Sequence, residues 1–152
     1  MLNKALVALA FGLSGAGVAL AAQSAPAPDT LKIVDAAIPQ PLTSVAGNAT
    51  AGRQVFLDRK QGNCYACHTV SLLKDQPFPG QIGPVLDGVA TRYTAGQLRL
   101  IVTNSKLMFP GTIMPAFYHL AGLKREPANL KGKTILTPQQ IEDVIAFLQT
   151  LK

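Results

Sequence analysis

The sequence contains one cluster of reactive side chains, Cys64-Tyr65-Ala66-Cys67-His68, and no other cysteine. Two cysteines separated by two residues and followed at once by a histidine form the attachment pattern of c-type haem. The spacing suits this chemistry because two thiols can add across the vinyl groups of one porphyrin edge, while the adjacent histidine reaches the iron from one face. The motif therefore predicts one haem c bound covalently by Cys64 and Cys67, with His68 as an axial iron ligand.

Three other chemistries use paired cysteines, and the sequence argues against each. A thioredoxin-like Cys-x-x-Cys lies in a βαβ unit, but no apolar strand runs alternate with helices around this motif. A structural zinc site closes with four ligands, whereas the chain contains only two cysteines and two histidines. A simple disulfide would leave His68 without a role.

The iron needs a ligand on the face opposite His68, and three side chains are candidates. Met114 precedes a proline in an irregular segment between two expected helices, and a thioether ligand raises the reduction potential, which suits an electron carrier. Met108 lies at the end of an amphipathic helix, where methionine commonly fills the core. His119 would give a bis-histidine site with a lower potential. We favour Met114 and keep the other two as alternatives.

The segment after the motif provides further candidates around the haem. A histidine that binds a metal usually donates its other ring N–H to an acceptor such as a carbonyl oxygen, and the carbonyl of Pro84, in the Gly83-Pro84 pair, is the predicted acceptor for His68. Arg92 and Tyr93 are candidates to neutralise or hydrogen-bond a haem propionate. The simpler interpretation of Arg92 is a solvated side chain beside a helix start.

The N-terminal residues have the features of a secretory signal peptide. A basic start at Lys4, an apolar run and a small-residue exit near Ala21 are typical of such a peptide. We therefore expect residues 1–21 to be removed and the mature chain to lie in the periplasm. The alternative, a retained membrane anchor, is disfavoured by the glycines and the marginal length of the run.

The remaining chain is long enough for one small domain. Residues 22–48 contain four prolines, which prevent a continuous helix, and form a predicted arm that lies along the domain or along a partner; a mobile linker is the alternative. Residues 49–152 form the predicted haem domain. Without Lys4 the formal charge is +5, which favours acidic partners or small anions. Nucleic acid is not an expected partner, since the exported chain has no basic helix or basic arm.

Three helices are expected, and no strand pattern is present. The first covers about residues 50–60 and is capped by Thr50. The second covers about residues 95–106 and the third begins at Pro138; a Thr-x-x-Gln capping box precedes each. The third carries the clearest apolar stripe, formed by Ile141, Val144, Ile145 and Leu148.

From about residue 49 to the C-terminus the chain resembles the class I cytochromes c. Gly52 and Phe56 match the small and aromatic positions of the family's N-terminal helix, and Val144 and Phe147 match the positions that cross them on the C-terminal helix. The resemblance implies an all-α fold of three to five helices around one covalently bound haem. The run between Phe56 and the first haem cysteine is longer than in short carriers of this family.

More narrowly, the chain resembles the SoxX family, the small monohaem subunits of the SoxAX cytochromes of sulfur oxidation. The matching segments are residues 62–68, 83–89, 97–100, 112–118 and 132–137. The resemblance implies a heterodimer with a SoxA cytochrome subunit. That complex couples thiosulfate oxidatively to a cysteine of the carrier protein SoxY, an L-cysteine S-thiosulfotransferase type of activity, and passes electrons to a downstream acceptor cytochrome. Catalysis in that family resides on a SoxA haem.

This chain is expected to relay electrons and not to catalyse. With His68 and Met114 bound, its iron has no open position for a substrate, and with both cysteines in thioethers no thiol remains as a nucleophile. A free periplasmic cytochrome c shuttle and the cytochrome subunit of another redox enzyme are the alternatives. The Pro-rich arm favours a bound subunit, because an apolar extension adds little to a lone shuttle.

Overall fold

The computed structural model describes residues 24–152, so the predicted signal peptide lies outside the described part. Within residues 24–152 the chain forms helices and turns, with one isolated β-bridge between Val34 and Ala37 and no strand. The all-α prediction is therefore confirmed. No helix in this part of the chain is long and apolar enough to cross a membrane.

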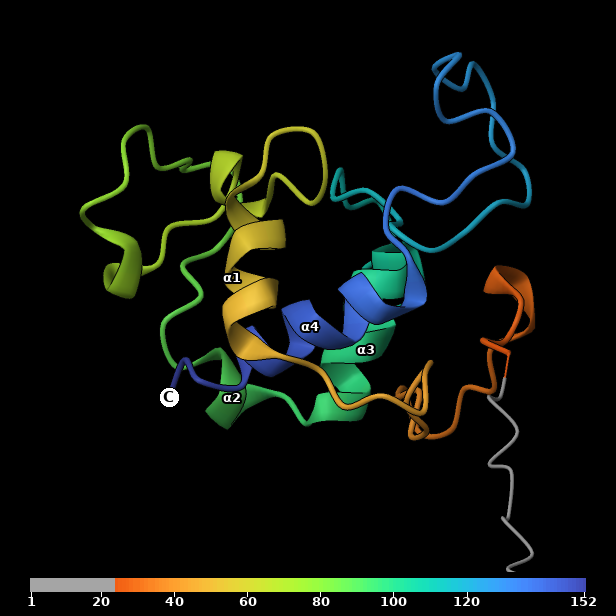
Figure 1. Cartoon of the computed structure of the whole chain (residues 1–152), viewed down its shortest axis with the longest axis horizontal. Helices are drawn as coiled ribbons and strands as arrows, with labels where there is room; N and C mark the ends of the chain where they lie inside the picture. Colours follow the sequence, from red (N-terminus) through yellow and green to blue (C-terminus); the bar gives the residue numbers. More distant parts are fainter. Residues whose placement is uncertain (1–23) are drawn as a thin grey trace, which may run out of the picture.

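Within residues 24–152 four α-helices form the body, and short 3-10 turns lie in the segments before and between them. In chain order the elements are η1 (Pro28–Thr30), α1 (Ala49–Leu57), η2 (Cys64–Ala66), η3 (Ser71–Leu73), α2 (Val89–Arg92), α3 (Ala95–Asn104), η4 (Ser105–Leu107) and α4 (Pro138–Leu148). Helices α1, α3 and α4 lie together at the centre, and long loops project from them on two sides (Figure 1).

Helices α1 and α4 cross closely at Gly52. A Cβ on Gly52 would overlap the carbonyl oxygen of Asp143 and would stand 2.9 Å from the amide nitrogen of Val144. Next to this crossing the rings of Phe56 and Phe147 meet edge to face, with centroids 5.3 Å apart. The predicted pairing of these two helices is confirmed, and residues 58–63 connect the end of α1 to the cysteine motif.

The capping boxes predicted for α3 and α4 are both present. Thr94 and Gln97 exchange side-chain and backbone hydrogen bonds at the start of α3, and Thr137 and Gln140 do the same at the start of α4. Each box satisfies two backbone N–H groups that have no partner inside the helix. Helix α3 ends at Asn104, two residues earlier than predicted, because η4 replaces its last turn.

Two helix predictions were wrong in detail. The N-cap of α1 is Asn48, whose side chain accepts a hydrogen bond from the amide of Ala51 at 3.0 Å, and not Thr50. The helix ends at Leu57, because the next residue, Asp58, has an extended backbone and turns the chain by accepting from the amide of Lys60. Helix α2 was not predicted, because four residues are too few to show a periodic pattern.

Residues 37–48 of the predicted arm are packed on the helical domain. Ile38 and Leu42 are buried in the core. Glu142 of α4 accepts a hydrogen bond from the amide of Leu42 at 2.9 Å, and Arg99 of α3 donates to the carbonyl of Ile38 at 2.7 Å. Arg99 and Glu142 also form a buried ion pair, with Nε and Oε1 2.7 Å apart. This part of the arm therefore belongs to the same packed unit as the helices.

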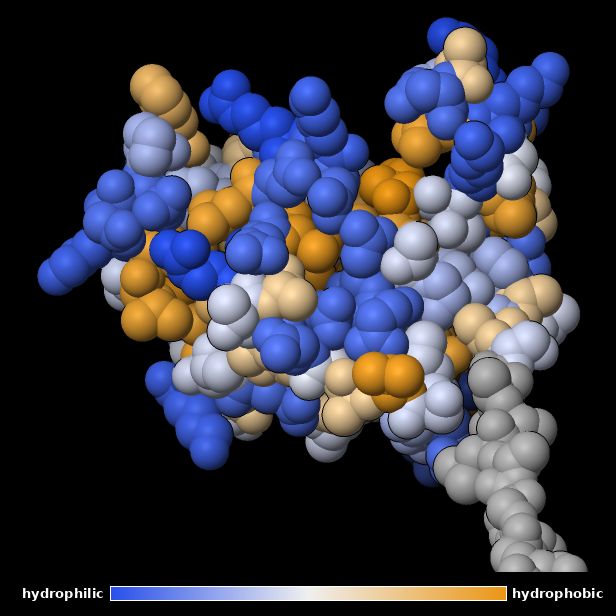
Figure 2. All heavy atoms as spheres, viewed as in Figure 1, coloured by the Kyte–Doolittle hydropathy of each residue, from blue (hydrophilic) through white to orange (hydrophobic). Residues whose placement is uncertain are grey.

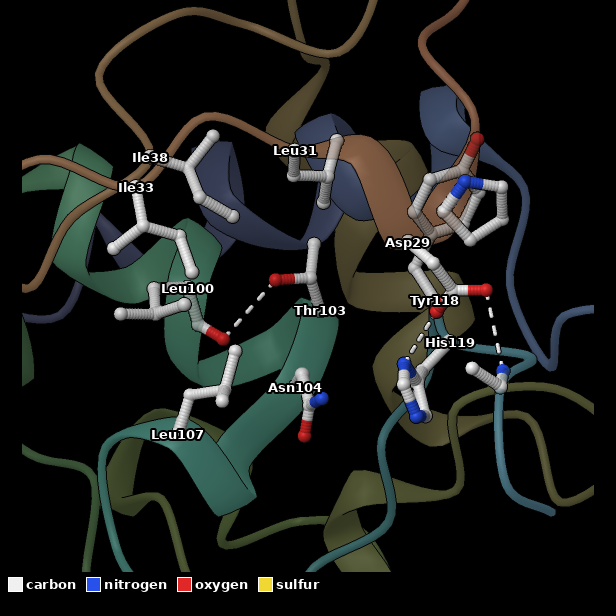
Figure 3. Close-up of a pocket in the computed structure, with 12 residues that line it drawn as sticks. Asp29, Leu31, Ile33, Ile38, Leu100, Thr103, Asn104, Leu107, Tyr118 and His119 are labelled. Atoms are coloured by element: carbon white, nitrogen blue, oxygen red, sulfur yellow. Dashed lines mark hydrogen bonds and ion pairs between the residues drawn. The ribbon is translucent and has the colours of Figure 1, made fainter.

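The start of the arm lies against the loop that follows the predicted methionine ligand. Pro26 accepts a hydrogen bond from the hydroxyl of Tyr118 at 2.8 Å. A carboxylate oxygen of Asp29 lies 2.6 Å from Nδ1 of His119, and Asp29 also accepts a hydrogen bond from the amide of Ala121. An apolar pocket of about 280 Å³ lies along this seam, between Leu31 of the arm and α3 (Figure 3). Of the alternatives left open by the sequence, the structure supports an arm that lies along its own domain.

Candidate haem site

The cysteine motif forms one tight turn, which follows α1 after the connecting residues 58–63. The amides of Cys67 and His68 both donate to the carbonyl of Cys64, at 3.1 and 2.9 Å. In a 3-10 turn, residues three apart lie on the same side, so both cysteine side chains start from one face of the turn. Tyr65 anchors the turn, because its ring packs near Phe56 and its hydroxyl donates to the carbonyl of Leu73 at 2.9 Å.

Both cysteine thiols are free in the structure. Burial raises the pKa of the Cys64 thiol to about 12, so it is a neutral thiol before attachment. Residues 24–152 contain no group of three or more His, Cys, Asp or Glu side chains that could hold a metal ion. The described residues therefore form neither the disulfide nor the closed zinc site considered as alternatives.

The loop after the motif holds the imidazole of His68 from two sides. Its Nδ1 lies 2.8 Å from the carbonyl oxygen of Pro84, which is the contact anticipated from the sequence. The backbone of Gly83 packs against the ring, and a Cβ there would stand 2.6 Å from Nδ1. The amide of Gly83 also donates to the carbonyl of Cys67 at 2.8 Å. An N–H at Nδ1 that points to Pro84 leaves Nε2 as the ring nitrogen that can bind a metal.

Arg92 makes a different contact from the one anticipated. Its guanidinium donates to the carbonyl of Asp87 at 2.7 Å and to that of Val85 at 3.2 Å. Arg92 therefore stabilises the loop that carries Pro84, and its contact with a propionate stays a prediction. Tyr93 is half-buried against the core, and its predicted role is likewise untested.

Met114 and Cys64 pack against the same buried core. Met114 lies in the loop between η4 and α4, where its carbonyl accepts hydrogen bonds from the Ser105 hydroxyl at 2.8 Å and from the Lys106 ammonium at 2.6 Å. These two contacts could not be predicted, because they depend on how the loop folds back over the end of α3. Met108 is also half-buried against the core.

His119, the other alternative to Met114, is engaged elsewhere. Its Nδ1 lies 2.6 Å from a carboxylate oxygen of Asp29 in the arm, at the seam shown in Figure 3. This contact occupies Nδ1 and leaves Nε2 as the ring nitrogen of His119 that could bind a metal. Met114 as the second ligand therefore stays a prediction, with His119 as an alternative.

The residues present fit a haem c. Two free thiols start from one side of a single turn, and the next residue is a histidine that is oriented through Nδ1. Gly83 leaves no side chain where the imidazole stands. A thioether side chain, Met114, packs on the same core. This fold and this site define a small all-α electron-transfer protein with a single covalent haem.

Comparisons with known proteins agree with this class. Residues 49–152 match the model of the family described as Cytochrome c, and the chain belongs to that family. The crystal structure of SoxXA from P. pantotrophus is 44% identical, with a TM-score of 0.78, and the match covers 84% of this chain and 98% of that one. The resemblance to the SoxX family is therefore confirmed, together with its single covalently bound haem c.

A second solved structure is more distant. The c-type cytochrome SorU from Sinorhizobium meliloti is 28% identical, with a TM-score of 0.44, over 68% of this chain and 88% of that one. A search of curated protein sequences finds no match.

Proposed function

We propose that this chain is the electron-relay subunit of a periplasmic complex of the SoxAX type. Cys64 and Cys67 would hold the haem, and His68 and Met114 would bind its iron. The observation that carries the proposal is the 44% identity to SoxXA over nearly the whole of that chain. The fold of the site alone fits a free shuttle equally well.

The ligand set favours relay over catalysis. When bound, the haem supplies a reversible one-electron change at its iron, and the thioether of Met114 would set a potential above that of a bis-histidine site. With His68 and Met114 both bound, the iron would have no coordination position for a substrate. With Cys64 and Cys67 both in thioethers, no thiol would remain as a nucleophile. Joining thiosulfate to a SoxY thiol by an S–S bond releases two electrons and one proton, so this chain would pass the electrons singly from SoxA to an acceptor cytochrome.

Exposed apolar side chains next to the proposed ligands favour a bound subunit. Val85, beside the His68 acceptor Pro84, is 53% exposed, and Ile113, beside Met114, is 79% exposed. Figure 2 shows apolar side chains at the surface where the loop after His68 projects, whereas the lobe of residues 120–133 is mainly polar. A protein partner that covers this surface would remove it from water.

Co-purification with SoxA tests the proposal. The processed chain, isolated from its native periplasm under mild conditions, should bring a larger haem-bearing subunit with it in equal amount. Val85→Ser and Ile113→Ser should each weaken that association about tenfold, as loss of a central apolar contact does. The matched control is Leu123→Ser, which removes an apolar side chain, 42% exposed, from the polar lobe. A chain that emerges alone and monomeric would favour a free shuttle.

The contribution of the arm to SoxA binding is better tested by point substitutions than by deletion. Removal of residues 22–48 would also remove Ile38 and Leu42 from the core. Substitution of the outward residues Val34 and Val45 by serine leaves the core intact and should weaken SoxA binding if the arm takes part.

Mass spectrometry of the native protein tests the proposed loss of residues 1–21, since a retained anchor would add their mass.

A further inference from the structure

The loop that contains Met114 is attached to the end of α3 by two side-chain donors. The hydroxyl of Ser105 and the ammonium of Lys106 both donate to the Met114 carbonyl, at 2.8 and 2.6 Å. Lys106 also donates to the carbonyl of Thr112 at 2.6 Å. A charged donor that bridges two carbonyls of one loop holds that loop more strongly than a neutral donor does.

Backbone hydrogen bonds hold the loop on the other side of Met114. The amides of Phe117 and Tyr118 donate to the carbonyls of Val102 and Thr103, at 3.3 and 3.0 Å. These carbonyls lie in the last turn of α3 and have no partner within the helix. The backbone of Met114 is therefore held between two attachments to the same helix end, and one of the two consists of Ser105 and Lys106.

We propose that Ser105 and Lys106 are positioning residues that keep Met114 on the iron. Ser105 is fully buried, so its hydroxyl fixes the carbonyl in one place, and Lys106 closes the loop from the solvent side. Any opening of the iron–sulfur bond that carries the Met114 backbone away must break both hydrogen bonds. The proposal rests on Met114 being the axial ligand.

Imidazole binding to the oxidised holoprotein measures this opening. Imidazole replaces a methionine ligand only after the bond opens, and the weak iron–sulfur(Met) charge-transfer band disappears as it binds. Ser105→Ala should raise the apparent affinity for imidazole about tenfold, as expected for loss of one such hydrogen bond. Lys106→Leu removes the hydrogen bonds to Thr112 and Met114 and should raise it by at least as much. Lys106→Arg keeps the charge and the donors, so it should stay within about twofold of the unchanged protein.

Lys131→Leu is the matched control, because it removes one exposed lysine from the polar lobe at a distance from Met114 in the chain. It should also stay within about twofold, which separates hydrogen bonding from net charge. Lys106 is exposed, so Lys106→Leu decides the question even if the buried Ser105→Ala does not fold.

The outcomes separate this inference from the ligand assignment. If the unchanged protein shows the charge-transfer band and both variants bind imidazole as it does, the positioning role is overturned while Met114 remains the ligand. If the unchanged protein lacks the band, Met114 is not the ligand and both statements are overturned.

Discussion

The backbone of Gly83 lies against the imidazole of His68 so closely that a Cβ on residue 83 would stand 2.6 Å from Nδ1. The next residue, Pro84, accepts the hydrogen bond of that same nitrogen at 2.8 Å. One dipeptide therefore sets both the position of the ring and its rotation. Each function depends on a different property, the missing side chain of glycine and the carbonyl of proline.

Gly83→Ala should displace the imidazole. The added methyl group overlaps the ring, and overpacking of this kind costs about 1–3 kcal/mol. If the ring turns away, it also loses the Pro84 hydrogen bond. We expect less haem-bearing protein and an altered electron paramagnetic resonance spectrum in the oxidised state, which reports the axial ligands. Gly122→Ala is the control, because its φ of +70° gives backbone strain of about 1 kcal/mol without any atom near the new methyl group.

Gly52→Ala should weaken the crossing of α1 and α4. The new methyl group overlaps the carbonyl oxygen of Asp143, which is backbone and cannot move without the helix. We expect a loss of about 2–3 kcal/mol in the free energy of unfolding, measured in urea. Thr50→Ala, at an exposed position of the same helix, should change it by less than about 0.5 kcal/mol. Equal stability of both variants would contradict the crossing.

The buried pair of Arg99 and Glu142 should show strong coupling in a double-mutant cycle. Arg99→Met leaves a buried carboxylate without its charge partner, and Glu142→Met does the same to the guanidinium, so each should cost about 3–5 kcal/mol. The double variant should cost clearly less than the sum of the two. Additive losses would mean that the two side chains stabilise the fold independently.

Asp87 should make stability depend on pH in the acidic range. The hydroxyl and amide of Ser71 donate to its carboxylate, at 2.6 and 2.9 Å, and they hold the pKa of Asp87 below its usual range. A lowered pKa in the folded state contributes stability above the unfolded value of about 3.9. That contribution is lost as the pH falls through the folded value.

The difference in melting temperature between the unchanged protein and Asp87→Asn should therefore be largest near neutral pH and should shrink below about pH 4. Asp35→Asn, in the arm, serves as the control. A difference that stays constant from neutral to acidic pH would show that Asp87 acts through something other than its charge.

The parts of the fold that could be predicted are those specified locally. A capping box is a four-residue signal, so the starts of α3 and α4 follow from the sequence alone. Asn48 was missed as a cap because Thr50, two residues later, also belongs to the residue types that cap helices. Helix α2 was missed because four residues show no periodicity.

The parts that could not be predicted depend on contacts between distant segments. A charged residue such as Arg99 is usually exposed to solvent. Arg99 is buried because the arm folds back over it and accepts its hydrogen bond at the Ile38 carbonyl. Ile101, on the same helix, is only half-buried, because the arm covers another face of α3. The haem motif was evident because it is contiguous, whereas Ser105 and Lys106 acquire their role only when the loop closes on α3.

The most direct test of iron ligation by Met114 is the absorption spectrum of the oxidised protein, compared between the unchanged chain and Met114→Ala. We expect an iron–sulfur(Met) charge-transfer band in the unchanged chain, its loss in Met114→Ala, and its retention in His119→Gln and in Met108→Leu. Absence of the band from the unchanged chain, or its survival in Met114→Ala, would contradict ligation of the iron by His68 and Met114.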